Sequence, residues 1–347
     1  MDTACNACRR SRCNISQTLH STTNVNLLVL NNSSDHAGPV TGTLDEVQEI
    51  TIDKPASWRP AVAVAITVVA WASAFVVIRY AAHDLRPGAL TLGRLLVASV
   101  ALSVMMIGRK LVALTGREWA LTAVVGIAWY AIYSVALNAG EQHVDAGTAA
   151  MLIQLAPILI GVLAGVLLGE GFPRMLVIGG LVAFAGTLII GIATSTGQAD
   201  LVGVLLVLLS ATVYAIAMVA QKVVLRRISA LQVTWLACLI GTLACLPFAG
   251  QLVADLGTAP YLSIVGVVYL GLVPTALAFS TWAYALRYTT AGKLGVTTFA
   301  VPPITIVLGW FLLDEVPPVL AIVGGALSLV GVAIARTKPR IKVLSDR

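Results

Sequence analysis

Long apolar stretches alternate with short polar segments along most of the chain, and the charged residues are concentrated in those segments. A helix needs about 20 apolar residues to cross roughly 30 Å of hydrocarbon. Ten stretches meet this requirement, and we expect membrane-spanning helices close to residues 60–78, 87–108, 119–140, 146–169, 175–194, 201–221, 230–248, 260–286, 294–313 and 316–335. The stretches are continuous rather than alternating between apolar and polar positions, which favours helices over the strands of a transmembrane barrel.

The same unit of five predicted helices occurs twice, and several residues near the end of each unit recur after 145 positions. The matched pairs are Gly147 and Gly292, Pro157 and Pro302, Glu170 and Glu315, and Gly186 and Gly331. A unit with an odd number of helices ends on the opposite side of the membrane from where it began, so the second copy must be inverted. The pattern predicts an all-α membrane protein with ten transmembrane helices arranged as two inverted five-helix repeats, an architecture of secondary transporters.

This pattern divides the chain into four regions. Residues 60–195 form the first repeat and residues 201–336 the second. Residues 1–59 are rich in Ser, Thr and Asn without a helical period, so we expect a disordered polar tail. Residues 337–347 form a basic tail, which we expect in the cytoplasm.

Composition and charge favour a membrane location over a nucleic-acid partner. Hydrophobic residues make up 58% of the chain and charged residues only 11%, whereas soluble domains carry about 25% charged residues. The net charge of +6 reflects topology, because a cytoplasmic N-terminus places most Lys and Arg residues in cytoplasmic loops and tails. We therefore expect a multi-pass protein of the plasma (inner) membrane with both termini cytoplasmic and with no nucleic-acid partner.

Motifs in both halves identify a family resemblance. They are Trp71-Ala-Ser-Ala-Phe75, Arg94 after Pro87, Ala146-Gly-Thr-Ala-Ala150 leading to Pro157, Leu168-Gly-Glu170, and Ala291-Gly292 with Pro302 and Leu313-Asp-Glu315. On these residues the chain resembles the drug/metabolite transporter (DMT) superfamily, in its EamA-domain family, over about residues 60–336. The second half departs from the usual Leu-Gly-Glu by having Asp314 in place of Gly. The resemblance implies a ten-helix carrier of small metabolites.

Arg94 is the main ionisable candidate inside a predicted span. It lies seven residues after Pro87, which places it about 10 Å into its helix. An ionisable group at such a depth is a functional candidate, since its burial in lipid is costly. Two interpretations remain open. Arg94 faces a cavity and pairs with an anionic group of the substrate, or it reaches the outer interface along its aliphatic stem or caps the end of a neighbouring helix.

Polar and aromatic side chains within the spans complete the predicted substrate-binding set. Besides Arg94, the set consists of Trp71, Ser73, Tyr130, Tyr133, Gln154, Tyr214, Trp282 and Thr298. Gln154 carries the most weight because a mid-span amide seldom faces lipid and needs a hydrogen-bonding partner. We expect these residues near the middle of the membrane, with Arg94 near the outer mouth of a cavity.

Matched prolines and acids are candidates for hinges and gates. Pro157 and Pro302 lie within predicted spans, where proline removes an amide hydrogen bond and frees a carbonyl one turn back. They predict either paired hinges or fixed kinks that widen the cavity. Glu170 and Glu315 end corresponding helices, and they predict either alternating gate contacts or, the reading we favour, structural contacts that hold a turn.

The sequence offers little support for metal binding, catalysis or nucleotide hydrolysis. Cys5, Cys8 and Cys13 lack a fourth ligand at zinc spacing. The predicted spans contain no His and no paired acids for an enzyme mechanism, and the chain has no phosphate-binding loop. We therefore expect neither a cofactor nor a metal.

The expected function is secondary transport that exports small metabolites (amino acids or related compounds, or toxic small molecules) by alternating access. The alternatives are an intramembrane enzyme or a non-transporting membrane receptor or structural protein. The expected partners are a small-molecule substrate and the lipid bilayer. A glycine stripe at Gly161, Gly165 and Gly169 predicts close packing within the monomer, with a homodimer seam as the alternative.

Overall fold

A computed structural model describes residues 58–144, 146–197, 200–313 and 316–337. The predicted tails lie outside the described residues except for Trp58, Arg59 and Thr337, and Glu315 also lies outside them. Every secondary-structure element of the described residues is a helix. The predicted all-α class is therefore confirmed for this part of the chain.

The helices of the first half, in chain order, are α1 (Trp58–Ala81), α2 (Pro87–Met106), α3 (Gly116–Val124), η1 (Val125–Tyr133), α4 (Ser134–Gly140), α5 (Ala146–Ile153), α6 (Leu155–Leu167) and α7 (Arg174–Thr194). Those of the second half are α8 (Leu201–Val224), α9 (Ala230–Cys245), η2 (Leu246–Phe248), α10 (Ala249–Leu256), α11 (Tyr261–Leu270), η3 (Gly271–Leu277), α12 (Ala278–Tyr288), α13 (Ala291–Val296), η4 (Thr297–Ala300), α14 (Val301–Leu313) and α15 (Val319–Arg336).

Nine helical stretches of the described residues are long and apolar enough to cross a membrane, so the protein is a multi-pass membrane protein. The predicted span at 146–169 is represented among these residues by a shorter apolar helix over Met151–Leu167, and it divides at Gln154, between α5 and α6. Pro157 explains the division: it has no amide hydrogen to donate to the carbonyl of Ile153, so the hydrogen-bond ladder fails one turn before the proline.

The corresponding stretch of the second half is also irregular at the same place. Its helix changes to the 3₁₀ segment η4 (Thr297–Ala300) directly before α14, which carries Pro302 and Pro303 in its first turn. Both halves therefore have an interruption just ahead of the matched prolines. The carbonyl groups left without an intrahelical partner lie near the middle of each stretch, where they can meet a polar ligand or a neighbouring helix.

A π-helix occupies the third predicted span of each half, as η1 and η3. In η3 the cause is Pro274, which cannot donate an amide hydrogen bond to Leu270. The Thr275 hydroxyl donates to that Leu270 carbonyl instead, at 2.7 Å. Such π segments often occur at functional sites. The first half has no proline in η1, so its sequence carries no comparable signal.

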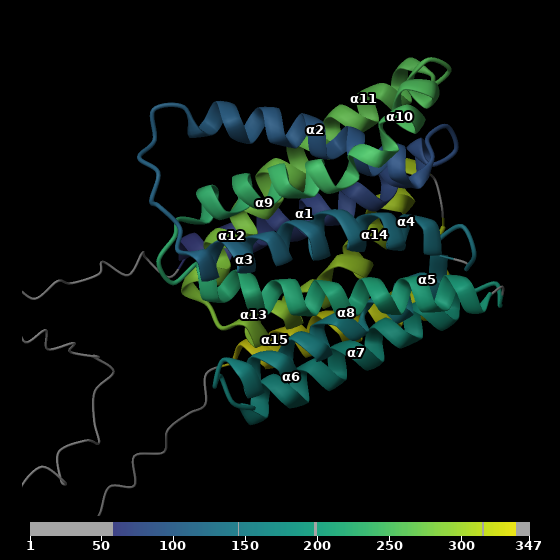
Figure 1. Ribbon diagram of the computed structural model, residues 1–347. Coiled ribbons are helices and arrows are strands. Elements are labelled where there is room, and N and C mark those ends of the chain that lie inside the picture. The colour runs from purple at the N-terminus through teal and green to yellow at the C-terminus, as the bar shows by residue number, and fades with distance from the viewer. Residues whose placement is uncertain (1–57, 145, 198–199, 314–315, 338–347) are drawn as a thin grey trace, which may run out of the picture. The chain divides into compact units, whose positions relative to one another are not determined.

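Helices α7 and α15, one from each half, cross closely and lie side by side in Figure 1. A Cβ placed on Gly179 would lie 2.5 Å from the Gly331 carbonyl oxygen, and one on Gly324 would lie 2.7 Å from that of Gly186. The Gly pairs therefore run in opposite order along the two helices, as an antiparallel crossing requires. Larger residues at these positions would force the helices apart.

The bundle of helices has two ends, which we call the open end and the closed end and define by the loops that lie at each. The open end carries the loops 82–86, 141–144 and 257–260, and the closed end carries the loops 107–115, 168–173, 225–229 and 289–290. The closed-end loop between α2 and α3 lies at the left in Figure 1. Hydrogen bonds across the halves hold each group of loops together, since Arg86 reaches Asp255 at the open end and Arg227 reaches Ala113 at the closed end.

Candidate functional site

Two adjoining cavities lie among the central helices. The inner cavity has a volume of about 110 Å³ and lies against α1, α2, η1, α8 and η3. The outer cavity, of about 380 Å³, extends from it to residues of the open end such as His83 and Gln142. Both are lined by Asn138, Glu141 and Gln154, so they form one hollow from the centre to the open end.

Most of the predicted substrate-binding residues line this hollow. Those on the inner cavity are Trp71, Arg94, Tyr133, Gln154, Tyr214 and Thr298, together with the predicted hinge Pro157. Pro302 lines the outer cavity. The structure therefore brings together residues from α1, α2, η1, α8 and η4, whose positions are far apart in the sequence.

Aromatic rings close the hollow on the side of the closed end. We define the aromatic floor as Trp71, Trp129, Tyr214 and Phe279, all of which line the inner cavity. The ring centroids of Trp129 lie 4.9 Å from those of both Tyr214 and Phe279, and that of Trp71 lies 5.8 Å from Phe279. Such contacts make a firm apolar surface for an apolar part of a ligand.

Arg94 is buried on the wall of the inner cavity, with 9% of its surface exposed. Its Nε donates to the Thr275 hydroxyl at 3.1 Å, and that hydroxyl donates onward to the Leu270 carbonyl. Among the described residues no carboxylate forms an ion pair with Arg94. A buried cation without a counter-charge strongly favours an anion, so this part of the wall is suited to a carboxylate.

Gln154 lies at the break between α5 and α6 and lines both cavities. It is 7% exposed. Ile153, whose carbonyl Pro157 leaves without its amide donor, also lines the inner cavity. The break therefore presents an amide beside a backbone carbonyl.

Three predicted binding residues do not line the hollow. Ser73 lies within hydrogen-bond distance of the Tyr269 hydroxyl, at 2.7 Å, and donates to the Ala70 carbonyl. Tyr130 and Trp282 are fully buried beneath the aromatic floor, where Trp282 packs on Trp71 with ring centroids 4.8 Å apart. Spacing along a helix could not distinguish these positions, because residues packed behind the cavity wall are of the same types as the residues that line it.

Several cavity residues were not in the predicted set. Trp129 and Phe279 form half of the aromatic floor, and Asn138 and Glu141 line both cavities. The Asn138 amide also donates to Thr91 at 3.2 Å. An amide and a carboxylate near the end of a span carried a usable signal for Asn138 and Glu141, whereas Trp129 and Phe279 resemble any buried aromatic residue.

The acid Glu170 joins the two halves at the closed end. Its carboxylate accepts hydrogen bonds from the backbone amides of Ala291 and Gly292, at 2.7 and 3.0 Å. These amides begin α13, where a negative charge is favourable. Lys222 lies at the same end and donates from Nζ to the carbonyls of Leu286 and Thr289.

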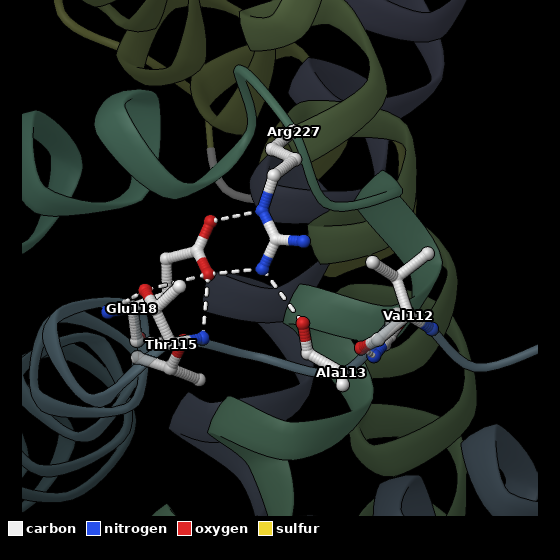
Figure 2. A network of polar contacts seen from close by, with 7 residues as sticks. Val112, Ala113, Thr115, Glu118 and Arg227 are labelled. Carbon is white, nitrogen blue, oxygen red and sulfur yellow. Dashed lines mark hydrogen bonds and ion pairs between the residues drawn. The ribbon is translucent and has the colours of Figure 1, made fainter. Parts of the chain in front are cut away.

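A second polar network at the closed end is drawn in Figure 2. Arg227 donates to the Glu118 carboxylate and, at 2.6 Å, to the Ala113 carbonyl. Glu118 in turn accepts from the amide and hydroxyl of Thr115 and completes the capping box of α3. The hydrogen bonds that Arg227 donates to Glu118 raise the pKa of Arg227 above its ordinary value.

The open end has a similar link between the halves. Arg86 donates from Nε to Asp255 at 3.0 Å and from Nη2 to the Gln251 carbonyl. The hydrogen bond with Asp255 raises the pKa of Arg86 above its ordinary value. Both arginines therefore stay charged at any physiological pH.

These features define an integral membrane protein with a central hollow that is open at one end. Comparison with known proteins places it further: the profile of the EamA-like transporter family matches residues 58–192 and 201–337. The chain belongs to this family, which confirms the resemblance inferred from its motifs. The profile matches once in each half of the chain.

Curated relatives are named as transporters. The chain is 37% identical over 272 residues to a "Probable terminal-alkyne amino-acid exporter" of Streptantibioticus cattleyicolor, covering 78% of this chain and 91% of that one. It is 27% identical to the uncharacterized transporter YdfC of Bacillus subtilis, over 77% of this chain and 88% of that one. An uncharacterized transporter of Archaeoglobus fulgidus is 28% identical, over 80% and 98% of the two chains.

A solved crystal structure shares the fold. It superposes with a TM-score of 0.68 at 19% sequence identity and covers 81% of this chain and 98% of the other. At this identity the likeness extends to the fold alone.

Proposed function

We propose that the protein is a secondary transporter that exports small amino-acid-like metabolites across the plasma membrane by alternating access. The observation that carries the proposal is the hollow, which is open at one end and closed by rings and hydrogen bonds at the other. It contains a buried arginine that has no counter-charge among the described residues. A carrier needs such a site near the middle of the membrane.

The proposal includes ten spans in two inverted repeats, with the shorter helix over Met151–Leu167 forming part of the fourth span. The crossing of α7 and α15 supports the inversion. Gly179 meets Gly331 and Gly186 meets Gly324, while the 145-residue offset matches Gly179 to Gly324 and Gly186 to Gly331. Exchanging the halves therefore exchanges the two contacts, as a two-fold axis requires.

The orientation follows from the basic residues. Arg109, Lys110, Arg117, Arg174, Arg226, Arg227, Arg287 and Lys293 lie in or next to loops of the closed end. The open end has Arg86 in its described loops. Because cytoplasmic loops hold an excess of Lys and Arg, we assign the closed end to the cytoplasm and the hollow to the outside.

The lining favours a small zwitterion with an apolar side chain. The guanidinium of Arg94 suits the carboxylate of such a solute. The aromatic floor suits the apolar side chain. The relative named as a terminal-alkyne amino-acid exporter supports this class of cargo.

The test is uptake of labelled apolar amino acids into inside-out membrane vesicles that contain the carrier. Replacing Arg94→Gln should reduce transport more than about tenfold, because a carboxylate would lose its buried partner. The matching amines, which lack the carboxylate, serve as the control and should be affected much less. Transport that does not depend on the carrier, or that Arg94→Gln leaves unchanged, would contradict the proposal.

A further inference from the structure

Gln221 is a fully buried amide that the cavity does not explain. Its side chain is 0% exposed, and among the described residues no donor or acceptor lies within hydrogen-bond distance of its Nε2 or Oε1. Burial of an unpaired amide is unfavourable, so most such groups in proteins find a partner. We therefore expect the Gln221 amide to find a hydrogen-bond partner in another conformation.

The position of Gln221 follows from its spacing to the aromatic floor. It lies seven residues after Tyr214 on α8, which places it about 10 Å further along the helix and on nearly the same face. Tyr214 belongs to the floor, and Lys222, next along the chain from Gln221, holds the carbonyls of Leu286 and Thr289 at the closed end. Gln221 thus lies between the floor and the closed end.

Other unpaired polar atoms lie on or beneath the same floor. The hydroxyls of Tyr130 and Tyr214 and the indole nitrogen of Trp282 also lack a hydrogen-bond partner within the described parts of the chain. Tyr130 and Trp282 pack under the floor without lining the hollow. Tyr130, Tyr214 and Trp282 therefore add unpaired polar atoms within the aromatic floor or directly against it.

The first half of the chain has a counterpart to the face of α8 that carries Tyr214 and Gln221, and this counterpart lines the hollow. Helices α1 and α8 each have 24 residues, and Trp71 and Tyr214 occupy the same position counted from their first residues. By the same count Ile78 corresponds to Gln221. Ile78 lines both cavities, so the stripe from Trp71 to Ile78 forms a wall of the open pathway.

We infer that Gln221 lines the solute pathway in the conformation that opens at the closed end, where its amide hydrogen-bonds the ammonium or carboxylate group of the passing zwitterion. The inference rests on the proposed function and extends it to the second half of the transport cycle. An amide suits both charged groups because it donates and accepts. Its lack of partners in the present conformation also makes that conformation less favourable, which helps the carrier to leave it.

The test is the side from which single cysteines react with an impermeant thiosulfonate reagent, in right-side-out and inside-out vesicles. The background is the full chain with Cys5, Cys8, Cys13, Cys238 and Cys245 replaced by Ser. Ile78→Cys should react from the open-end side, and Gln221→Cys from the opposite side only. Ser328→Cys is the matched control, because Ser328 is equally buried but satisfied by the Phe299 carbonyl, and it should react from neither side.

Two results would overturn the inference: reaction of Gln221→Cys from the same side as Ile78→Cys, or no reaction from either side in a carrier that transports. A second variant, Gln221→Leu, should lower turnover and leave the affinity measured from the open end unchanged, whereas turnover equal to that of the unmodified protein contradicts the inference. Failure of the cysteine-free carrier to move any amino acid would instead contradict the proposed function, because the labelling pattern needs no solute.

Discussion

The open and closed ends of the helical unit carry the same kind of arginine link, yet the hollow reaches only the open end. In each case the arginine lies in the loop between the first two spans of one half. It donates to a backbone carbonyl and to a carboxylate that follow the apolar part of the second span in the other half. Arg86 does so with Gln251 and Asp255, and Arg227 does so with Ala113 and Glu118. The arginine links therefore do not decide which end is closed.

The difference between the ends lies in the central helices. At the closed end Glu170 ties the end of the α6 stretch to the start of α13, and Lys222 ties α8 to the end of α12. Nearer the middle of the helices the same stretches line the hollow with Pro157, Thr298 and Tyr214. The comparison indicates that contacts among these central helices close the pathway, while the arginine links hold the flanking helices together.

The largest effect on the balance of the two ends is expected from Glu170→Gln. A neutral amide cannot replace a carboxylate that accepts two backbone amide hydrogens, so the closed end should lose about 1.5 kcal/mol, or roughly tenfold in the conformational equilibrium. Labelling of Ile78→Cys should then fall and that of Gln221→Cys should rise. Unchanged labelling would show that Glu170 holds only the local turn.

A smaller effect is expected from Thr275→Val, which keeps the shape but removes the acceptor for Arg94 Nε. Loss of one hydrogen bond of about 1 kcal/mol should weaken carboxylate binding roughly fivefold, because the guanidinium is no longer held toward the hollow. Competition by the matching amines should be unaffected, and Thr275→Ser should restore binding.

A matched control for Thr275→Val is Thr187→Val. Thr187 is equally buried and donates to a carbonyl of its own helix, but it does not line the hollow. Its replacement should leave affinity unchanged. If both valine variants lose affinity equally, Thr275 acts through general stability and not through Arg94.

The smallest effects are expected from Arg86→Ala and Arg227→Ala. Both side chains are about half exposed, and exposed ion pairs contribute little. Transport by each variant should stay within about threefold of the unmodified protein, since exposed pairs rarely matter more. An Arg227→Ala variant that by itself makes Gln221→Cys much more reactive would show that the arginine link, and not the central helices, keeps the closed end shut.

Hydropathy and repeated motifs determined the class, the family and most of the spans. Uncharged stretches of this length have few alternatives to crossing a bilayer, and nine of them form such helices in the described part of the chain. Pro157 also marked its irregular stretch correctly, since its missing amide acts on its own helix. These are local consequences of residue type, which is why they can be read from the chain alone.

The composition of the site was decided by the tertiary structure. Trp71 and Trp282 are both tryptophans within apolar spans, yet one lines the hollow and the other lies behind it. Gln154 and Gln221 are both buried amides, yet only Gln154 faces the hollow in this conformation. Every face of such a helix is apolar enough to contact lipid or protein, so the sequence does not show which face of the helix points toward the hollow. Only the packing of the two halves against each other decides which side chains meet at the centre.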